Sequence, residues 1–186
     1  DSLSHSMKLR KGSQDATGLT FGIVASKFNK FVTSRLLTEC VKALTKAGVT
    51  DEAIEVVRVP GAFEIPLVAR QLARSGRFDA VICLGAVIRG DTPHFEYIST
   101  EVSRGILQAS MDPNLPVIFG VLTTDTVAQA IERADPEKLN RGADVAKTAI
   151  EMVNVMRLLK KEGSGEAPQP ATPSRRAGRS AARPKR

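Results

Sequence analysis

AVICLGAVIRGDTPHFEY, residues 80–97, joins three kinds of segment in one stretch. Residues 80–88 are uncharged and almost entirely apolar, which predicts a buried β-strand. A polar loop follows around Gly90, and a helix pattern begins at about residue 95. Ligands of α/β proteins bind beyond the carboxyl ends of the strands. This stretch therefore predicts an α/β fold and also where its chemistry takes place.

His94 lies in the polar loop, and the only other histidine, His5, lies in a polar N-terminal segment. A histidine in such a loop is a candidate general acid or base near neutral pH. The other interpretation is a residue at the start of a helix whose side chain is already hydrogen-bonded. The residues alone leave both interpretations open.

Strand and helix patterns alternate through the middle of the chain. Strands are predicted at residues 20–26, 54–59, 80–88 and 117–122, and helices at residues 32–47, 63–75, 95–110, 126–134 and 143–160. Nearly continuous apolar strands, each followed by a helix, are typical of a parallel sheet covered on both faces. We predict a three-layer α/β/α sandwich with a four-stranded parallel sheet. The segment before Thr20 leaves open a fifth strand, within the chain or on a neighbour's sheet edge.

Basic charge is concentrated at the C-terminal end of the chain. Residues 163–186 contain six Lys or Arg against one Glu, a net charge of +5 out of +7 for the whole chain. They contain no Val, Ile, Leu or aromatic residue, which predicts disorder. We divide the chain into an N-terminal arm (1–17), one α/β/α domain (18–160) and a disordered basic tail (161–186). The tail is a solubilising appendage or an arm for a polyanion such as RNA or DNA, and its lack of aromatics favours the former.

Cysteine usage and hydropathy indicate the compartment. Cys40 and Cys83 lie in apolar patterns, as expected for small buried hydrophobes of a reducing compartment, and no Cys/His spacing predicts a metal site. No apolar run approaches the roughly 20 residues of a membrane span. Residues 1–18 lack the apolar segment of a secretory signal. We expect a cytoplasmic protein with no membrane partner.

Two further loops at predicted strand ends carry candidate binding residues. Phe28 lies between polar residues, so it either stacks on a planar ring or packs under the first helix. In the loop at residues 59–64, the turn before Ala62 exposes backbone N–H groups at a helix start. Glu64 can accept hydrogen bonds from a hydroxyl or amino ligand, or is simply favoured by the helix dipole.

A fourth loop, Thr123-Thr124-Asp125, is better interpreted as a helix cap. The four loops lie at the ends of strands in one parallel sheet, so they converge on one rim. Together they predict a pocket with an aromatic plate, a carboxylate, a histidine and backbone donors.

An ordered set of motifs resembles the lumazine synthase family. The matching segments are FN at 28–29, VPGAFEIP at 59–66, Gly85 with VIRG at 87–90 and then His94, PVIFGVLTT at 116–124, and QAIERA at 129–134. The resemblance covers about residues 18–160. It implies a transferase of riboflavin biosynthesis that joins 5-amino-6-(D-ribitylamino)uracil to 3,4-dihydroxy-2-butanone 4-phosphate, losing phosphate and water. It implies neither a metal nor an organic cofactor.

The resemblance also implies roles for individual residues. His94 and Arg133 would be catalytic. The substrate-binding residues would be Phe28, Asn29, Gly61, Ala62, Phe63, Glu64, Ala86, Val87, Ile88, Gly90, Asp91, Thr92, Phe119, Arg133, Arg141 and Asp144.

In that assignment Phe28 stacks on the pyrimidine ring, and Arg133 is the main charge partner of the phosphate. Phe119 and Arg133 reach the site from the adjacent subunit, and Asp144 is a hydrogen-bond partner for His94.

Homo-oligomers are implied as well, as a pentamer or a hollow icosahedral shell of 60 subunits. One departure lies at residues 135–142, DPEKLNRG, where many bacterial members have a Lys-rich loop. Arg141 keeps the charge of the final lysine, whereas Glu137 replaces a basic residue.

Two rivals to the synthase have different chemistry. A flavin-binding module of the same flavodoxin-like fold class needs a phosphate loop after the first strand, and residues 26–29, SKFN, are poor in Ser, Thr and Gly for that purpose. The second rival is an icosahedral shell or polyanion-binding protein that acts through the basic tail. The residues from Gly61 to Glu64, with His94 and Arg133, argue against a lapsed pocket.

Overall fold

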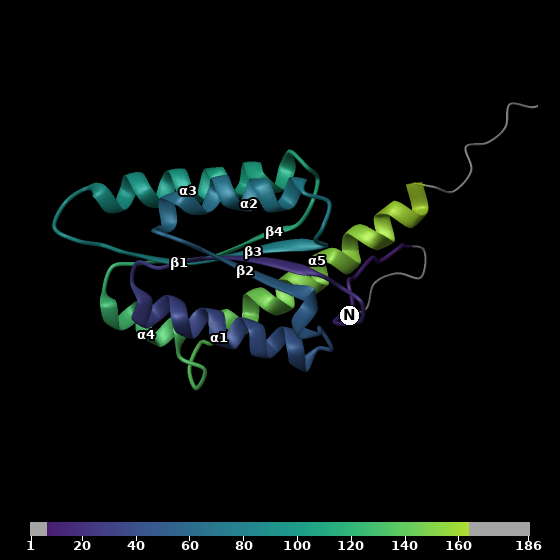
Figure 1. Cartoon of the computed structure of the whole chain (residues 1–186), viewed down its shortest axis with the longest axis horizontal. Helices are drawn as coiled ribbons and strands as arrows, with labels where there is room; N and C mark the ends of the chain where they lie inside the picture. The colour runs from purple at the N-terminus through teal and green to yellow at the C-terminus, as the bar shows by residue number, and fades with distance from the viewer. Residues whose placement is uncertain (1–6, 164–186) are drawn as a thin grey trace, which may run out of the picture.

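A parallel sheet of four strands forms the centre of the computed structural model, which describes residues 7–163 (Figure 1). In chain order the elements are β1 Phe21–Ser26, α1 Lys30–Lys46, η1 Asp51–Ala53, β2 Ile54–Val59, η2 Ala62–Glu64, α2 Ile65–Arg74, β3 Ala80–Ile88, α3 His94–Met111, β4 Val117–Thr124, α4 Val127–Ala134 and α5 Arg141–Gly163. The predicted α/β class is confirmed.

The strands are ordered β2-β1-β3-β4, and all neighbours run parallel. From β1 the chain moves to one side to form β2, then crosses back to form β3 and β4 on the other side. Such an order is that of the first four strands of a flavodoxin-like sheet, in which ligands bind where the direction of winding reverses. The reversal here lies between β1 and β3, which are the two central strands.

Helices cover both faces of the sheet (Figure 1). Helices α2 and α3 lie on one face, and α1, α4 and α5 on the other. Alternate residues of β3 enter the two cores: Ile82 and Leu84 pack with α1 and α5, whereas Val81 and Cys83 pack with α2 and α3. Burial on both faces is the reason that the strand lacks the polar alternation of a half-exposed sheet.

Both cysteines are buried and unpaired, as their apolar surroundings in the sequence predict. Burial raises the pKa of the Cys40 thiol to about 12, because the charged thiolate would lie in an apolar core. The pKa of Cys83 is raised for the same reason.

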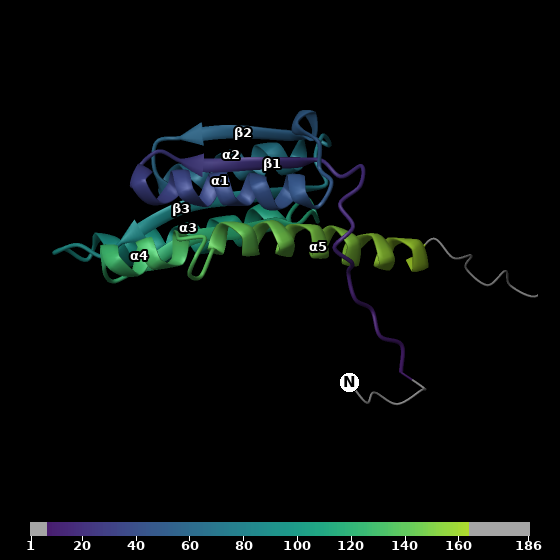
Figure 2. The same ribbon diagram turned by 90° about the horizontal axis from the view of Figure 1, so that it is seen from below.

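The described part of the N-terminal arm runs across α5 rather than along the sheet (Figure 2). The side-chain amide of Asn154 donates to the carbonyl oxygens of Ser13 and Asp15, at 2.9 Å each. Gln14 Nε2 donates to the carbonyl of Lys147 at 3.0 Å. These contacts hold the described part of the arm against α5, and it adds no fifth strand to this chain's own sheet.

Each of the five α-helices begins one or two residues from its predicted start, and two of these differences have a clear local cause. A short 3-10 turn, η2, precedes α2, and Pro66 lies at the first turn of α2, where its missing N–H is tolerated. The cap of α4 is Thr126, and β4 extends through Thr124, so the prediction that residues 123–125 form the cap is wrong by one residue. Thr126 caps the helix because Gln129 lies three residues later and completes a capping box with it.

The C-terminal helix is longer than expected. It begins at Arg141 and runs to Gly163, so the first three residues of the predicted tail are helical. The rest of that tail, residues 164–186, lies outside the described residues, as do residues 1–6 of the predicted arm. Among the described residues, no helix is both long and apolar enough to cross a membrane.

Candidate active site

A cavity of about 590 Å³ opens where the winding of the sheet reverses. It lies at the carboxyl ends of β1, β2 and β3, and its volume is typical of small-molecule sites. Its lining residues are Phe28, Asn29, Gly61, Ala62, Phe63, Glu64, Ala86, Val87, Ile88, Gly90, Thr92, His94, Phe95 and Ile98. Three of the four predicted loops therefore meet in one pocket.

Two phenylalanine rings project from loops at the cavity. The Phe28 residue is 71% exposed and Phe63 is 60% exposed. The loop of Phe28 is tied to the neighbouring strand end, since the Phe28 N–H donates to the carbonyl of Pro60 at 3.0 Å. Its exposure argues against packing under the first helix. A free ring at the mouth of the cavity is suited to stacking on a planar ligand.

Asn29 connects two walls of the cavity. Its backbone is left-handed, with φ 57° and ψ 47°, a conformation that asparagine adopts more readily than most residues. Its Nδ2 donates to the carbonyl oxygen of Ala86 at 3.0 Å. The hydrogen bond fixes the loop after β1 to the end of β3, which leaves the amide oxygen of Asn29 for a ligand.

The second loop places a carboxylate beside a tight turn. The Glu64 N–H donates to the carbonyl of Gly61 at 3.3 Å, within the turn that leads into α2. A Cβ atom at Gly61 would lie 3.3 Å from Glu64 Oε2, so the carboxylate folds back over the glycine. Glu64 remains exposed at the cavity and can accept hydrogen bonds from hydroxyl or amino groups.

His94 is the first residue of α3 and lines the same cavity. Its side chain is exposed, and that side chain forms no hydrogen bond to another residue in the described part of the chain. Thr92 and Gly90 from the preceding loop also reach the cavity, whereas Asp91 of the same loop does not line it. A histidine here can exchange a proton with a ligand bound between the loops.

Three predicted site residues line a different cavity. Phe119, Arg141 and Asp144 line a separate cavity of about 290 Å³ between β4 and α5. Arg141 Nη1 lies 3.3 Å from Asp144 Oδ2, so Asp144 is paired with Arg141 and not with His94 in this chain. Phe119 is 44% exposed although it lies in a strand.

Arg133 lies on α4 and lines neither cavity. Its Nη1 donates to the carbonyl of Gln129 at 3.2 Å, and it has no acidic partner among residues 7–163. The guanidinium therefore keeps its positive charge available to an anionic group.

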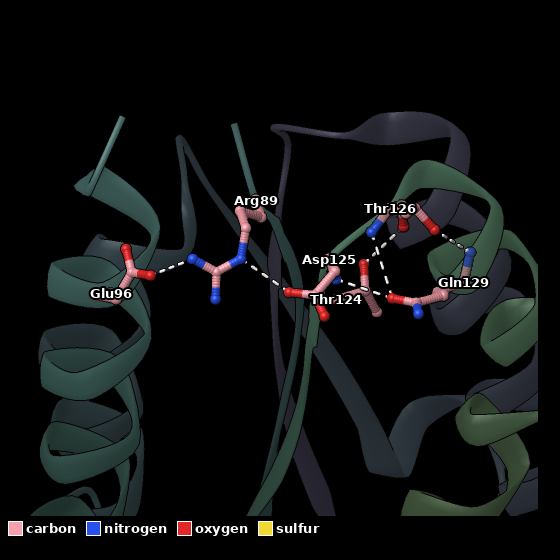
Figure 3. A network of polar contacts seen from close by, with 6 residues as sticks. All are labelled: Arg89, Glu96, Thr124, Asp125, Thr126 and Gln129. Carbon is pink, nitrogen blue, oxygen red and sulfur yellow. Dashed lines mark hydrogen bonds and ion pairs between the residues drawn. The ribbon is translucent and has the colours of Figure 1, made fainter. Parts of the chain in front are cut away.

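Arg89 joins the His94 loop to the end of β4, as Figure 3 shows. Its Nε lies 2.8 Å from Asp125 Oδ1, and its Nη1 is paired with Glu96. Its hydrogen bond to Glu96 lowers the pKa of that carboxyl, and the bonds to Asp125 and Glu96 raise the pKa of Arg89. The sequence places this arginine in the loop but does not predict its partners.

Phe95 and Ile98 were also missed as cavity residues. A spacing of three residues places both on one side of a helix, close to His94 at its first turn. That spacing was a usable signal once the helix start was known. In residues 7–163, no group of three or more His, Cys, Asp or Glu side chains is placed to hold a metal ion.

Comparisons with known proteins agree on one family. A family model described as 6,7-dimethyl-8-ribityllumazine synthase matches residues 18–157. A curated protein named 6,7-dimethyl-8-ribityllumazine synthase, from Syntrophus aciditrophicus (strain SB), is 60% identical over 147 residues. The aligned region covers 79% of this chain and 96% of that protein.

Proposed function

The chain belongs to the 6,7-dimethyl-8-ribityllumazine synthase family, and we propose that the cavity beside His94 is its active site, completed by an adjacent subunit. As a member of this family it is a transferase of riboflavin biosynthesis. It condenses 5-amino-6-(D-ribitylamino)uracil with 3,4-dihydroxy-2-butanone 4-phosphate to 6,7-dimethyl-8-ribityllumazine, and it releases phosphate and water. The observation that supports the site most strongly is the meeting of three loops at the reversal between β1 and β3.

The uracil substrate occupies the part of the cavity near β1 and β2. Phe28 stacks on the pyrimidine ring, and the backbone of Val87 and Ile88 contacts its edge. The ribityl hydroxyls meet Glu64 and Asn29, whose oxygen atoms are acceptors. Support comes from the exposure of Phe28 and Glu64 at this cavity. An aromatic plate with a few polar groups is how small planar ligands are commonly bound.

The butanone phosphate lies beside the loop that precedes α3. Backbone N–H groups at Gly90, Asp91 and Thr92 are donors to its phosphate, and Arg133 of a neighbouring subunit is the main cation. A guanidinium suits this role because its planar fork binds two phosphate oxygens at once. Arg141 adds a second positive charge.

The reaction needs little covalent help from the protein. The substrate's amine attacks the ketone and, with loss of water, forms an imine. Removal of a proton next to the imine lets the phosphate leave, and ring closure with loss of a second water gives the product. His94 transfers protons in these steps, which typically contributes about 10²- to 10⁴-fold to the rate. Holding the two reactants together supplies much of the rest.

The site is shared between subunits in our proposal. Within one chain, Phe119, Arg141 and Asp144 lie at a different cavity from His94. A heterologous contact in a closed ring brings one patch of each subunit against a different patch of the next, which suits such a split set. The chain forms a homo-oligomer, and we propose a pentamer that can assemble further into a 60-subunit shell. A cytoplasmic location stays a prediction from composition.

Lumazine formation from the two substrates tests the proposal, followed by product absorbance and fluorescence. Arg133→Ala removes charged hydrogen bonds worth roughly 1.5–3 kcal/mol, so we expect the KM for butanone phosphate to rise about 10- to 100-fold. Arg77→Ala is the control. Like Arg133, Arg77 is an arginine outside the cavity, but its charge is already paired with a surface carboxylate, so its loss should leave the KM for butanone phosphate unchanged. A wild-type assembly that forms no product above the spontaneous rate would overturn the assignment.

The shell or polyanion-binding alternative is not favoured by the family match. Its tail lies mostly in residues 164–186, outside the described residues. Deletion of those residues separates the two functions: the enzyme keeps its turnover, whereas a polyanion binder loses salt-sensitive binding to RNA.

A further inference from the structure

Arg89 is the first residue beyond β3, and its side chain turns toward the neighbouring strand end and helix (Figure 3). Its N–H donates to the carbonyl of Thr124 at 2.9 Å, which continues the β3–β4 ladder by one bond. The backbone of Arg89 is therefore fixed by the sheet. From this fixed point the chain passes through residues 90–93 to His94.

The guanidinium contacts three side chains, one just after β4 and two in α3. It bonds to Asp125 after β4, pairs with Glu96 in the first turn of α3, and lies 4.4 Å from the centroid of the Phe95 ring. Such a fork can hold two carboxylates in a defined geometry, which an ammonium cannot do. Arg89 thus fastens the start of α3 to the end of the sheet.

Residues 90–93, between Arg89 and α3, make few other stabilising contacts with the described residues. Pro93, the residue at the cap of α3, offers no side-chain hydrogen bond to the helix. Its carbonyl accepts from the Glu96 N–H at 3.1 Å. A Cβ atom at Gly90 would meet no neighbour within 4 Å, so the loop has open space on that side. The ion pair with Glu96 and the contact with the Phe95 ring are the Arg89 side-chain contacts that hold this loop and the start of α3 to the end of the sheet.

Asp125, the partner of Arg89 beyond β4, is itself held by hydrogen bonds. The Asp125 N–H donates to Gln129 Oε1 at 2.9 Å, and Gln129 also completes the capping box of α4 with Thr126. The carbonyl of Gln129 accepts from Arg133 at 3.2 Å. Asp125 is therefore a fixed support, connected through one glutamine to the helix that carries Arg133.

Charge argues against Arg89 as a direct phosphate ligand. One guanidinium faces two carboxylates, Asp125 and Glu96, so the cluster has a formal charge of −1. Its side chain also does not line the cavity. An anionic substrate gains little from this cluster, whereas Arg133 has no acidic partner among residues 7–163.

We propose that Arg89 is a positioning residue, which holds residues 90–93 and the first turn of α3 so that the phosphate donors and His94 face the cavity. The inference rests on the proposed function. It predicts a selective defect, because the groups that Arg89 places serve the butanone phosphate and the proton transfers, while Phe28 and Glu64 stand on other loops.

Steady-state kinetics of Arg89→Ala, with each substrate varied in turn, test the proposal. Displacements of about 1 Å can cost up to about 10²-fold in rate, so we expect kcat to fall and the KM for butanone phosphate to rise, each about tenfold. The KM for ribitylamino-uracil should stay within about twofold. Inorganic phosphate, used as a competing ligand, should inhibit the variant about tenfold more weakly.

Arg77→Ala is the matched control. Arg77 has the same kinds of partner at the opposite end of the sheet: Glu55 at 2.6 Å and the Phe78 ring centroid at 4.7 Å. It should leave both KM values unchanged. Arg89→Lys keeps the charge but not the fork, so it should recover little of the lost activity.

Three results would overturn the proposal: an equal rise in both KM values, effects no larger than those of Arg77→Ala, or full recovery in Arg89→Lys. If Arg89→Ala does not assemble, Glu96→Ala decides, since it removes one carboxylate partner and keeps the arginine. This variant should raise the KM for butanone phosphate selectively, and an unchanged KM would refute the positioning role of Arg89. An inactive wild type would instead refute the proposed function.

Discussion

Phe28→Ala should weaken binding of ribitylamino-uracil while barely changing stability. The side chain is already largely exposed, so folding buries only about three-tenths of it. Full burial of a phenylalanine is worth about 1.5–3 kcal/mol, which gives a loss of about 0.4–0.9 kcal/mol in the free energy of unfolding. For a chain of this size that corresponds to a fall of about 1–4 °C in Tm.

The loss in binding should be larger. Stacking of a base on an aromatic side chain is worth about 1–3 kcal/mol, and the open position of the ring argues for the lower end. We expect the Kd for ribitylamino-uracil to rise at least about fivefold, measured by equilibrium titration of substrate fluorescence. The KM for butanone phosphate should hardly change, because the phosphate donors stand on another loop.

Phe31→Ala is a control for which we expect the opposite pattern, with a larger loss of stability and no loss of substrate affinity. Phe31 lies three residues later on α1, is 49% exposed and does not line the cavity. Its truncation should cost more stability, about 0.8–1.5 kcal/mol, with no change in the Kd for either substrate. Equal loss of uracil affinity in both variants would refute the stacking role of Phe28. A loss in Phe63→Ala but not in Phe28→Ala would move that role to the second exposed ring.

Three further predictions test other parts of the structure. His94→Ala should lower kcat by about 10²- to 10⁴-fold with little change in substrate Kd, so a loss confined to Kd in single-turnover kinetics would contradict proton transfer. Gly142→Ala places a Cβ 2.5 Å from the Leu36 carbonyl oxygen, so chemical unfolding should show about 1–3 kcal/mol of destabilisation. An unchanged unfolding midpoint would argue against this tight contact between α5 and α1. The Cys40 thiol should react with a disulfide reagent roughly 10³-fold more slowly than a free thiol at pH 8, because its pKa is raised from 9.0 to about 12. Cys83 should react as slowly, because its pKa is raised as well. Rapid labelling of the folded chain would instead place a thiol at the surface.

The sequence predicts the sheet well because its signals are local. β2 and β3 have the predicted bounds, since β2 is closed by the Pro60-Gly61 turn and β3 ends at Ile88, just before the charged residue Arg89. The core pattern of β3 follows from burial on both faces. Helix starts are harder, because they depend on which side chains reach the backbone. Thr126 caps α4 only because Gln129 returns the hydrogen bond.

The cavity is predictable for a different reason. Parallel strands end at one rim, so the loops of Phe28, Glu64 and His94 had to meet once the sheet was assigned. The position of Arg133 relative to them was beyond pattern reasoning, since it depends on how α4 packs. The Arg89 contacts depend likewise on the distance between β4 and α3, which the sequence does not encode locally.

Each active site, in our proposal, takes His94 from one chain and Arg133 from the next. The direct test is to unfold a His94→Ala chain and an Arg133→Ala chain, refold them together, and compare lumazine formation with each variant alone. In a random 1:1 ring, a site has a one-half chance of an intact His94 on one side and a one-half chance of an intact Arg133 on the other. The mixture should therefore recover about one quarter of the wild-type rate per site. A mixture no more active than the average of the two variants would show that the site lies within one chain.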